Sequence, residues 1–246
     1  MTHEITEHVR IILFATQHPG NIGASARAMK TMGLQQLCLV TPRGYPSAEA
    51  TIRASGADDI LARAQVFDNL PAAIQDCAFV IGTSARVRNI AWPLLDPEAA
   101  AWKILQQAET GMPVAVVFGP ERTGLSNAEL DLCHAVVTIP VNPVFPSLNL
   151  AAAVQVISYE LRKAVLAGAD PPPASTGTST PVSAEQMQQF YEHLERYLVA
   201  TGYYHPGKPR LLMRRLRRMF NRMQPDQGEY NILRGILAAV SPPDKE

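Results

Sequence analysis

Two apolar segments of this chain each break into a loop of glycine or proline residues, and these loops carry the residue types that could bind a ligand. They are residues 114–125 (VAVVFGPERTGL) and residues 139–150 (IPVNPVFPSLNL). Apolar runs rich in β-branched residues are typical of buried parallel strands, and ligands of α/β sheets lie at the carboxyl ends of such strands. Because two such loops can close on one ligand, we expect the chemistry of this protein here.

A third loop, residues 20–26 (GNIGASA), follows an apolar run and precedes a helical pattern, as a dinucleotide-binding loop does. It lacks the middle glycine that lets the backbone approach a pyrophosphate. The apolar residues 37–40 are followed by Thr41 and Pro42, where an acidic residue would bind a ribose. The sequence also has no Gly-Lys-Ser/Thr loop. These observations argue against a nicotinamide enzyme and against hydrolysis of nucleoside triphosphates.

The elements that position these loops follow from the spacing of apolar residues. Asn21 is the expected N-cap of the first helix and Gly33 its C-terminal stop, while Asn149 is the expected N-cap of the last helix of this part. The expected strands are 9–15, 37–40, 78–83, 114–118 and 136–140, and the expected helices are 21–32, 57–64, 70–75, 97–108, 127–133 and 149–167. This alternation predicts an α/β fold with a parallel sheet.

Composition divides the chain into two parts. Residues 168–183 consist mostly of Pro, Gly, Ser, Thr and Ala with the single charge Asp170, which is typical of a linker. We therefore expect one domain over residues 1–167 and a second over residues 184–246. The second part has helical spacing at 184–200, 210–223 and 231–240. A module of about 60 residues is marginally stable alone, so we expect it to pack on the first domain or on a second subunit.

The net charge is zero, but the charges are unevenly distributed. Residues 1–167 carry 12 Lys and Arg against 14 Asp and Glu, whereas residues 184–246 carry 10 against 7. The segment 208–222 holds seven basic residues and no acidic one. A polyanion is one partner that fits such a segment, and a solvated cationic helix face is the alternative.

The remaining composition excludes several classes of protein. No apolar run approaches the roughly 18 residues of a membrane span, and the N-terminus has no apolar signal-peptide core, so a cytoplasmic protein without membrane contact is expected. Cys38, Cys77 and Cys133 are odd in number and lie among apolar neighbours. They fit buried thiols better than a disulfide or a zinc site, and we predict no metal site.

Three segments together resemble the sequence motifs of the SPOUT-class RNA methyltransferases. They are residues 21–27 with Asn21, Ser25 and Arg27, residues 118–125, and residues 139–140 with 147–160. Within that class, residues 83–86 (TSAR), 92–97 (WPLLDP) and 231–236 (NILRGI) resemble the bacterial TrmJ enzymes. Those enzymes methylate a ribose 2′-hydroxyl at nucleotide 32 of the tRNA anticodon loop. The resemblance covers nearly the full chain.

This resemblance implies a deep C-terminal trefoil knot in the sheet domain, a helical tRNA-binding extension, and a homodimer for which the helix at 149–167 is the expected contact. It also implies S-adenosylmethionine as the methyl donor, bound in a bent conformation. The positions implied for donor binding are Thr83, Ser84, Ala85, Gly119, Ile139, Pro146, Ser147 and Leu148. Physical reasoning agrees, because apolar side chains beside loop backbone suit adenine, and a glycine at 119 lets the backbone come close.

The resemblance implies that Arg27 is the catalytic residue and that it lies on the first turn of its helix. A guanidinium stays protonated and is a poor general base. We therefore expect Arg27 to bind the phosphate next to the target ribose and to stabilise negative charge on the 2′-oxygen. His18 in the preceding loop could act as a base or contact the substrate. Glu121 is expected to orient a neighbouring arginine or the amine of the donor.

Contacts with RNA are expected from basic residues of two regions. These are Arg86 and Arg88 near the site, and Arg214, Arg215, Arg217 and Arg218 in the helical extension. Two alternatives remain open from the sequence. One is a related methyltransferase that modifies another RNA nucleotide, and the other is an RNA-binding protein without catalytic activity.

Overall fold

The computed structural model describes residues 6–85, 94–168, 181–207 and 211–239. Its centre is a seven-stranded sheet with the strand order β3-β2-β1-β6-β4-β7-β5, in which the strand pairs run parallel. The strands are β1 (Val9–Phe14), β2 (Gln36–Val40), β3 (Gln65–Phe67), β4 (Phe79–Thr83), β5 (Leu94–Leu95), β6 (Val114–Phe118) and β7 (Ala135–Val137). The predicted α/β fold with a parallel sheet is confirmed.

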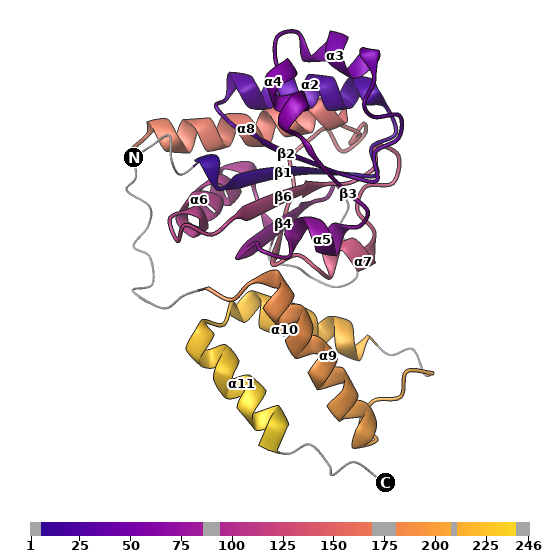
Figure 1. The fold of residues 1–246 in the computed structure, drawn as a ribbon, viewed down its shortest axis with the longest axis vertical. Coiled ribbons are helices and arrows are strands. Elements are labelled where there is room, and N and C mark those ends of the chain that lie inside the picture. The colour runs from indigo at the N-terminus through magenta and orange to yellow at the C-terminus, as the bar shows by residue number, and fades with distance from the viewer. Residues whose placement is uncertain (1–5, 86–93, 169–180, 208–210, 240–246) are drawn as a thin grey trace.

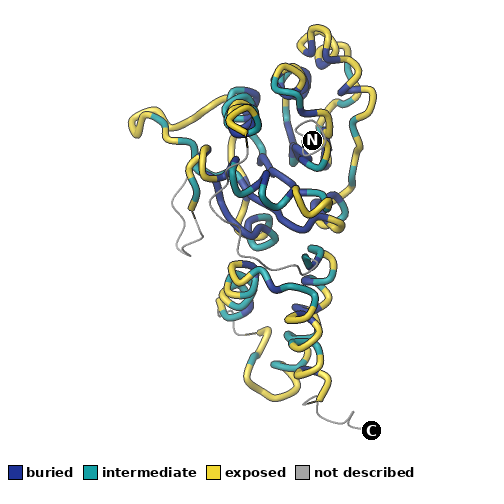
Figure 2. Tube along the Cα trace, turned by 90° about the vertical axis from the view of Figure 1, so that its left-hand side faces the viewer, coloured by how far each residue is buried: buried dark blue, intermediate teal, exposed yellow. Residues whose placement is uncertain are grey.

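The central strands β1 and β6 are buried on both faces because helices cover both sides of the sheet, and Arg10 of β1 is their one charged residue (Figure 1). One face carries α2 (Pro19–Thr31), α6 (Pro97–Ala108) and α8 (Leu150–Leu166), and α3 (Ala48–Ala54) and α4 (Asp58–Arg63) pack beside α2. The other face carries α5 (Leu70–Ile74) and α7 (Asn127–Leu130). The buried residues accordingly gather in the sheet and on the inner faces of the helices (Figure 2).

Most predicted elements lie within a few residues of their observed bounds, but the first helix differs at its start. It begins at Pro19 rather than Asn21, since proline is favoured in the first turn, where its missing N–H is not needed. Gly33 follows the helix at φ +83°, which confirms the predicted stop. The helix α3 and the short edge strand β3 were not predicted, and the two-residue strand β5 lies in a segment predicted as loop.

The expected dimer contact on α8 stays a prediction. Leu150, Val154, Ile157 and Leu161 of this helix are buried in the subunit's own core. The helix packs there against α2 and α6. A second subunit would therefore have to contact other residues of this helix.

The C-terminal part contains α9 (Ala184–Ala200), α10 (Leu212–Met223) and α11 (Gln227–Ala239), which lie below the sheet domain in Figure 1. Ser183 begins α9 with a capping box formed with Gln186. Phe190, Tyr191 and Tyr230 are central to a small core of this part. No helix in the described ranges is long and apolar enough to cross a membrane.

Candidate active site

The loops that follow β4, β6 and β7 surround one cavity of about 240 Å³. These three strands are neighbours in the sheet, so their carboxyl ends open at the same edge. The cavity lining includes all eight residues predicted for donor binding: Thr83, Ser84, Ala85, Gly119, Ile139, Pro146, Ser147 and Leu148. The loops singled out in the sequence therefore do close on a common space.

The walls of this cavity are apolar and its edges are polar. Val137, Ile139 and Leu150 contribute apolar side chains, whereas Thr83 and Ser147 bring hydroxyl groups. A flat ring with polar edges suits such surroundings, because its face displaces water from the apolar wall while backbone and hydroxyl groups satisfy its edge. The volume lies just below the roughly 300–1,000 Å³ of typical ligand pockets, which fits a ligand enclosed over part of its length.

Gly119 is required by the loop itself. A Cβ atom at this position would lie 2.3 Å from the Leu125 nitrogen and 2.5 Å from the Gly124 carbonyl carbon. Gly124 adopts φ +63°, and its N–H donates to the Pro120 carbonyl at 2.8 Å. The tight turn of residues 119–125 thus requires glycine at this position, and close approach of a ligand to Gly119 stays a prediction.

Glu121 caps the N-terminus of α2. Its carboxylate accepts hydrogen bonds from the Gln17 N–H at 3.0 Å, the His18 N–H at 3.3 Å and the Asn21 Nδ2 at 2.8 Å. Burial opposes the charge of Glu121, but these donors outweigh it and hold the pKa of the carboxyl below its ordinary value. In the described residues the carboxylate bonds to this helix end, and its expected role toward an arginine or a ligand amine stays a prediction.

This contact also explains why residues 20–26 resemble a phosphate-binding loop without its fingerprint. The strand order reverses between β1 and β6, where doubly wound sheets place a phosphate on a helix N-terminus. Here the carboxylate of Glu121 neutralises that helix end. The cavity lies on the other side of β6, between the ends of β6, β4 and β7.

Asn21 and Asn149 connect the three motif segments. The Asn149 Nδ2 donates to the Asn21 Oδ1 at 3.0 Å, and Asn21 in turn donates to Glu121. The Asn149 Oδ1 accepts from the N–H groups of Ala151 and Ala152, which confirms its predicted role as the N-cap of α8. Asn21 was predicted as an N-cap, but it lies inside α2 and bridges two loops instead.

Arg27 is exposed and does not line the cavity. It is the ninth residue of α2 and thus lies on the third turn, which corrects the expected position on the first turn. Counted from Asn21, six residues advance about 9 Å along the axis and rotate the side chain by about 240°. In the described part of the chain, no hydrogen bond or ion pair engages its guanidinium.

The basic residues expected at the RNA fall into three groups. Arg86 and Arg88 lie outside the described residues. Arg214 forms an ion pair with Asp131, and Arg217 stacks on the ring of Tyr191 with its guanidinium carbon 4.6 Å from the ring centre. Both of these arginines thus make contacts within the chain. Arg215 is exposed and Arg218 is half-buried.

The other ionisable candidates are accounted for by burial. No group of three or more His, Cys, Asp or Glu side chains that could hold a metal ion occurs among the residues described. The three cysteines are free and buried. Burial raises the pKa of Cys38 to about 11 and that of Cys77 to about 12, and it raises the pKa of Cys133 as well.

Comparison with known proteins gives two family matches. Residues 8–159 match the SpoU rRNA methylase family, and residues 185–246 match the C-terminal domain of the tRNA methyltransferase TrmJ. The chain is 47% identical to the tRNA (cytidine/uridine-2′-O-)-methyltransferase TrmJ of Cronobacter sakazakii, over 95% of this chain and 96% of that one. It is 50% identical to the tRNA (cytidine/uridine/adenosine-2′-O-)-methyltransferase TrmJ of Pseudomonas aeruginosa, over 94% and 93% of the two chains. Among solved structures it resembles TrmJ from Z. mobilis ZM4, with a TM-score of 0.81 and 38% identity over 95% of this chain and 99% of that chain.

Proposed function

This chain belongs to the SpoU methylase family and carries a TrmJ C-terminal domain, and from this premise we propose that it methylates the 2′-hydroxyl of a tRNA ribose with S-adenosylmethionine as the donor. The observation that carries the proposal is the single cavity at the ends of β6, β4 and β7, because all eight residues expected at the donor line it. The proposed target is a cytidine or uridine at nucleotide 32 of the anticodon loop. The relatives' names differ in the bases they include, and the ribose is common to them.

The proposal includes the finer architecture expected from the family resemblance. We propose a trefoil knot formed by the chain after Val136, within a methyltransferase domain of residues 1–167. A linker of residues 168–183 leads to a tRNA-binding extension of residues 184–246. The matched ranges 8–159 and 185–246 support this division. A tRNA substrate also supports the cytoplasmic location expected from the sequence.

The donor fits the residues that are present. The apolar wall of Val137, Ile139 and Leu148 would hold the adenine, and loop backbone beside Ser84 and Ser147 would satisfy its polar edge. When bound, S-adenosylmethionine supplies a methyl carbon on a positively charged sulfur, an electrophile whose leaving group needs no proton. The protein's task is therefore to bring the ribose oxygen to this edge of the sheet and to stabilise the charge that develops on it.

Arg27 is the residue proposed for this task. Its guanidinium would bind the phosphate beside the target ribose and stabilise negative charge on the 2′-oxygen, as an always-charged group with several donors can. The exposure of Arg27 and its freedom from contacts in the described residues leave it available to RNA.

The position of Arg27 further supports a homodimer in which it acts across the subunits. It lies about 9 Å further along α2 than Asn21 and points to another side of the helix. Asn21 is the residue of α2 that contacts Glu121 at the cavity. A second copy could bring its own Arg27 to this cavity, so each site would combine a donor pocket from one subunit with an arginine from the other.

The test is transfer of labelled methyl from S-adenosylmethionine to unmodified tRNA, followed by digestion to nucleosides. A 2′-O-methylpyrimidine at nucleotide 32 is the expected product. Label in a base, or on another ribose, would keep the reaction class but reject the target. Binding of both donor and tRNA without transfer would favour the second candidate, an RNA-binding protein that has lost its activity.

A further inference from the structure

The C-terminal helices are held on the sheet domain by polar groups of α10. Arg214 donates from Nε to Asp131 Oδ2 at 2.5 Å, and Asn221 donates from Nδ2 to the Cys133 carbonyl at 3.0 Å. The Tyr191 hydroxyl on α9 donates to the Asn221 Oδ1 at 2.6 Å and thereby fixes the orientation of the amide. One face of α10 is thus bound to the short segment that contains Asp131 and Cys133.

The ion pair between Arg214 and Asp131 is largely buried. The Asp131 side chain is only 13% exposed and that of Arg214 is 26% exposed. The second oxygen of Asp131, Oδ1, is buried and has no hydrogen-bond partner among the described residues. A carboxylate in such surroundings depends on its one cation, because removing the cation leaves a buried charge without compensation.

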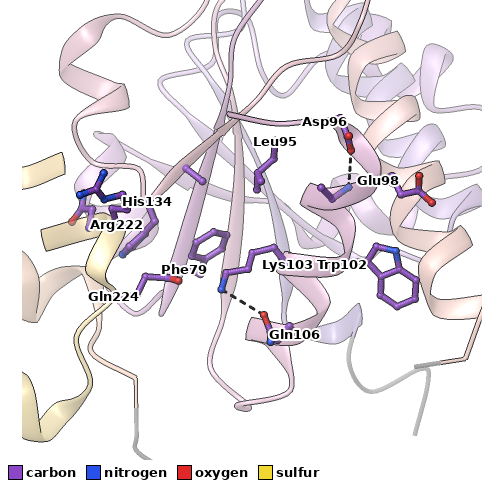
Figure 3. Close-up of a pocket in the computed structure, with 13 residues that line it drawn as sticks. Phe79, Leu95, Asp96, Glu98, Trp102, Lys103, Gln106, His134, Arg222 and Gln224 are labelled. Carbon is purple, nitrogen blue, oxygen red and sulfur yellow. Dashed lines mark hydrogen bonds between the residues drawn. The ribbon is translucent and has the colours of Figure 1, made fainter. Parts of the chain in front are cut away.

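The direct contact is narrow, since cavities flank it. One of about 560 Å³ lies between α6, β5 and the end of α10, and one of about 430 Å³ lies between α5 and α9. His134 and Asn221 line both. Figure 3 shows Arg222 and Gln224 beside His134 at one side of the larger cavity. With open space on both sides, close apolar packing does not fix the direction of α10, and the polar contacts carry that role.

The start of α9 supplies the other attachment. The N–H of Ala184 donates to the Cys77 carbonyl at 2.9 Å, and that of Glu185 donates to the Gln75 carbonyl at 3.1 Å. These backbone bonds hold the first turn of α9, and the contacts of Arg214 and Asn221 then restrict how the helices turn about it.

The segment to which α10 is bound also joins the two donor-binding loops. Residues 126–134 run from the loop at 119–125 to β7, which leads into the loop at 139–148. Leu125, Leu130 and Cys133 close around Gly82 of β4, where an added Cβ would lie within 2.9 to 3.1 Å of all three side chains. A contact with this segment is therefore fixed relative to the donor cavity.

We propose that Arg214, Asp131 and Asn221 are positioning residues that fix the direction of the basic helix α10 relative to the methyl-donor cavity. Arg214 acts through Asp131 and does not bind an RNA phosphate. This rests on the proposed function, because the direction of α10 matters only if the extension presents tRNA to the cavity. It also separates the basic helix into residues that hold the helix in place and residues, such as the exposed Arg215, that are left for the polyanion.

The test compares Arg214→Gln, Asp131→Asn and the double variant with Arg215→Gln as the matched neighbour. Each protein is measured for donor affinity, for kcat/KM with tRNA, and for the slope of tRNA affinity against salt concentration. Arg214→Gln and Asp131→Asn are each expected to lower kcat/KM by about tenfold, with no further loss in the double variant and no change in donor affinity. Arg215→Gln is expected to reduce the salt slope by about one, whereas Arg214→Gln leaves it unchanged.

The opposite pattern overturns the proposal. If Asp131→Asn keeps or strengthens tRNA binding while Arg214→Gln weakens it and reduces the salt slope, Arg214 is a phosphate contact. In a further variant the two charges are exchanged, with Asp131→Arg and Arg214→Asp in one protein. Turnover is restored in this variant only if the pair positions the helix. This variant also replaces a single variant that fails to fold. A wild-type protein that binds tRNA without methylating it would reject the proposed function alone, because the salt slopes still decide the role of Arg214. A wild type that binds no tRNA rejects both.

Discussion

Two polar side chains of α2 are used in different ways. Asn21 is fully engaged, since it donates to Glu121 and accepts from Asn149. Arg27 is exposed and has no such partner in the described residues. A long side chain that the fold does not fix can adapt to a substrate, whereas the asparagine joins α2 to two loops. Substitutions of Asn21 and of Arg27 should therefore impair the protein in different ways.

Replacing Arg27 by Ala is expected to lower kcat by about 100-fold or more, because a charge that stabilises the reacting oxygen is lost. Donor affinity, measured by titration calorimetry, should stay unchanged, since Arg27 does not line the cavity. Lys30→Ala is the control, because Lys30 lies on the same helix but bonds to Asp59. Loss of donor affinity equal to the loss of turnover in Arg27→Ala would refute the role.

His134 makes the stability of the protein depend on pH. Its Nδ1 accepts the N–H of Val80 at 3.0 Å, and burial lowers its pKa from 6.5 to about 4. Between these two values the unfolded chain binds a proton at His134 that the folded chain excludes. The free energy of unfolding therefore falls as the pH falls through this window.

This effect can be isolated with His134→Asn, which keeps a hydrogen-bond acceptor but does not titrate. From pH 7 to pH 5 the wild type is expected to lose about 2 kcal/mol more stability than the variant. Urea unfolding at the two pH values measures the difference. Equal losses in both proteins would mean that the pKa of His134 is the same in the folded and the unfolded chain.

At the scale of elements, the loop between β6 and α7, at the proposed donor cavity, leaves little room for an added side chain. In Gly119→Ala the new methyl group would meet the backbone of Leu125 and Gly124, so residues 119–125 must shift. An overpacking cost of about 1–3 kcal/mol at the cavity corresponds to a loss of donor affinity of roughly tenfold or more. Titration of the donor into the variant measures this loss.

Gly235→Ala serves as the control for this change. Gly235 lies in α11 with open space where its Cβ would be, so alanine should raise the free energy of unfolding by about 1 kcal/mol and leave donor affinity unchanged. Unchanged donor affinity in Gly119→Ala as well would show that the loop bends without consequence for the cavity.

Elements with strong local signals could be predicted from the sequence. The observed bounds of α6, β6 and α9 equal the predicted ones, since Asp96 and Ser183 cap the helices and β6 is uniformly apolar. The short elements α3 and β3 were missed; α3 has a Ser47 cap but spans only seven residues, and β3 spans three. The eight residues that the family resemblance implies for donor binding line one cavity, and their role toward a donor stays a prediction.

Contacts between distant parts of the chain could not be predicted in this way. Asn21 and Glu121 are 100 residues apart in sequence, and Arg214 and Asp131 are 83 apart. A run of arginines looks the same in one sequence whether its members meet RNA or the protein's own carboxylate. For this reason Arg214 and Arg217 were assigned to RNA, although both make contacts within the chain.

At the scale of the whole molecule, the donor cavity and the arginine proposed for catalysis are separate features of one subunit. If Arg27 acts across a dimer, two variants impaired at different parts of the site should complement each other. In a mixture of Arg27→Ala and Gly119→Ala subunits, each mixed dimer has one site that combines an intact cavity with an intact arginine. At a donor concentration too low to fill the weakened cavity of Gly119→Ala, random mixing then gives about a quarter of the wild-type activity, above the residual activity of either variant alone.

The mixture is prepared by unfolding and refolding the two proteins together, and methyl transfer to tRNA is measured. Refolded wild type gives the reference activity. Each variant refolded alone gives the background. No recovery in a mixture shown by size to be dimeric would place Arg27 and the cavity it serves in the same subunit.

Because its three cysteines are buried, the folded protein should react little with thiol reagents. With a pKa of about 11, the Cys38 thiol is ionised in only about one molecule in 10,000 at pH 7, and Cys77 less still. A single cysteine introduced at an exposed position such as 215 would then be the reactive one. The chain can thus carry a fluorophore or a cross-linker for RNA without prior removal of its native thiols.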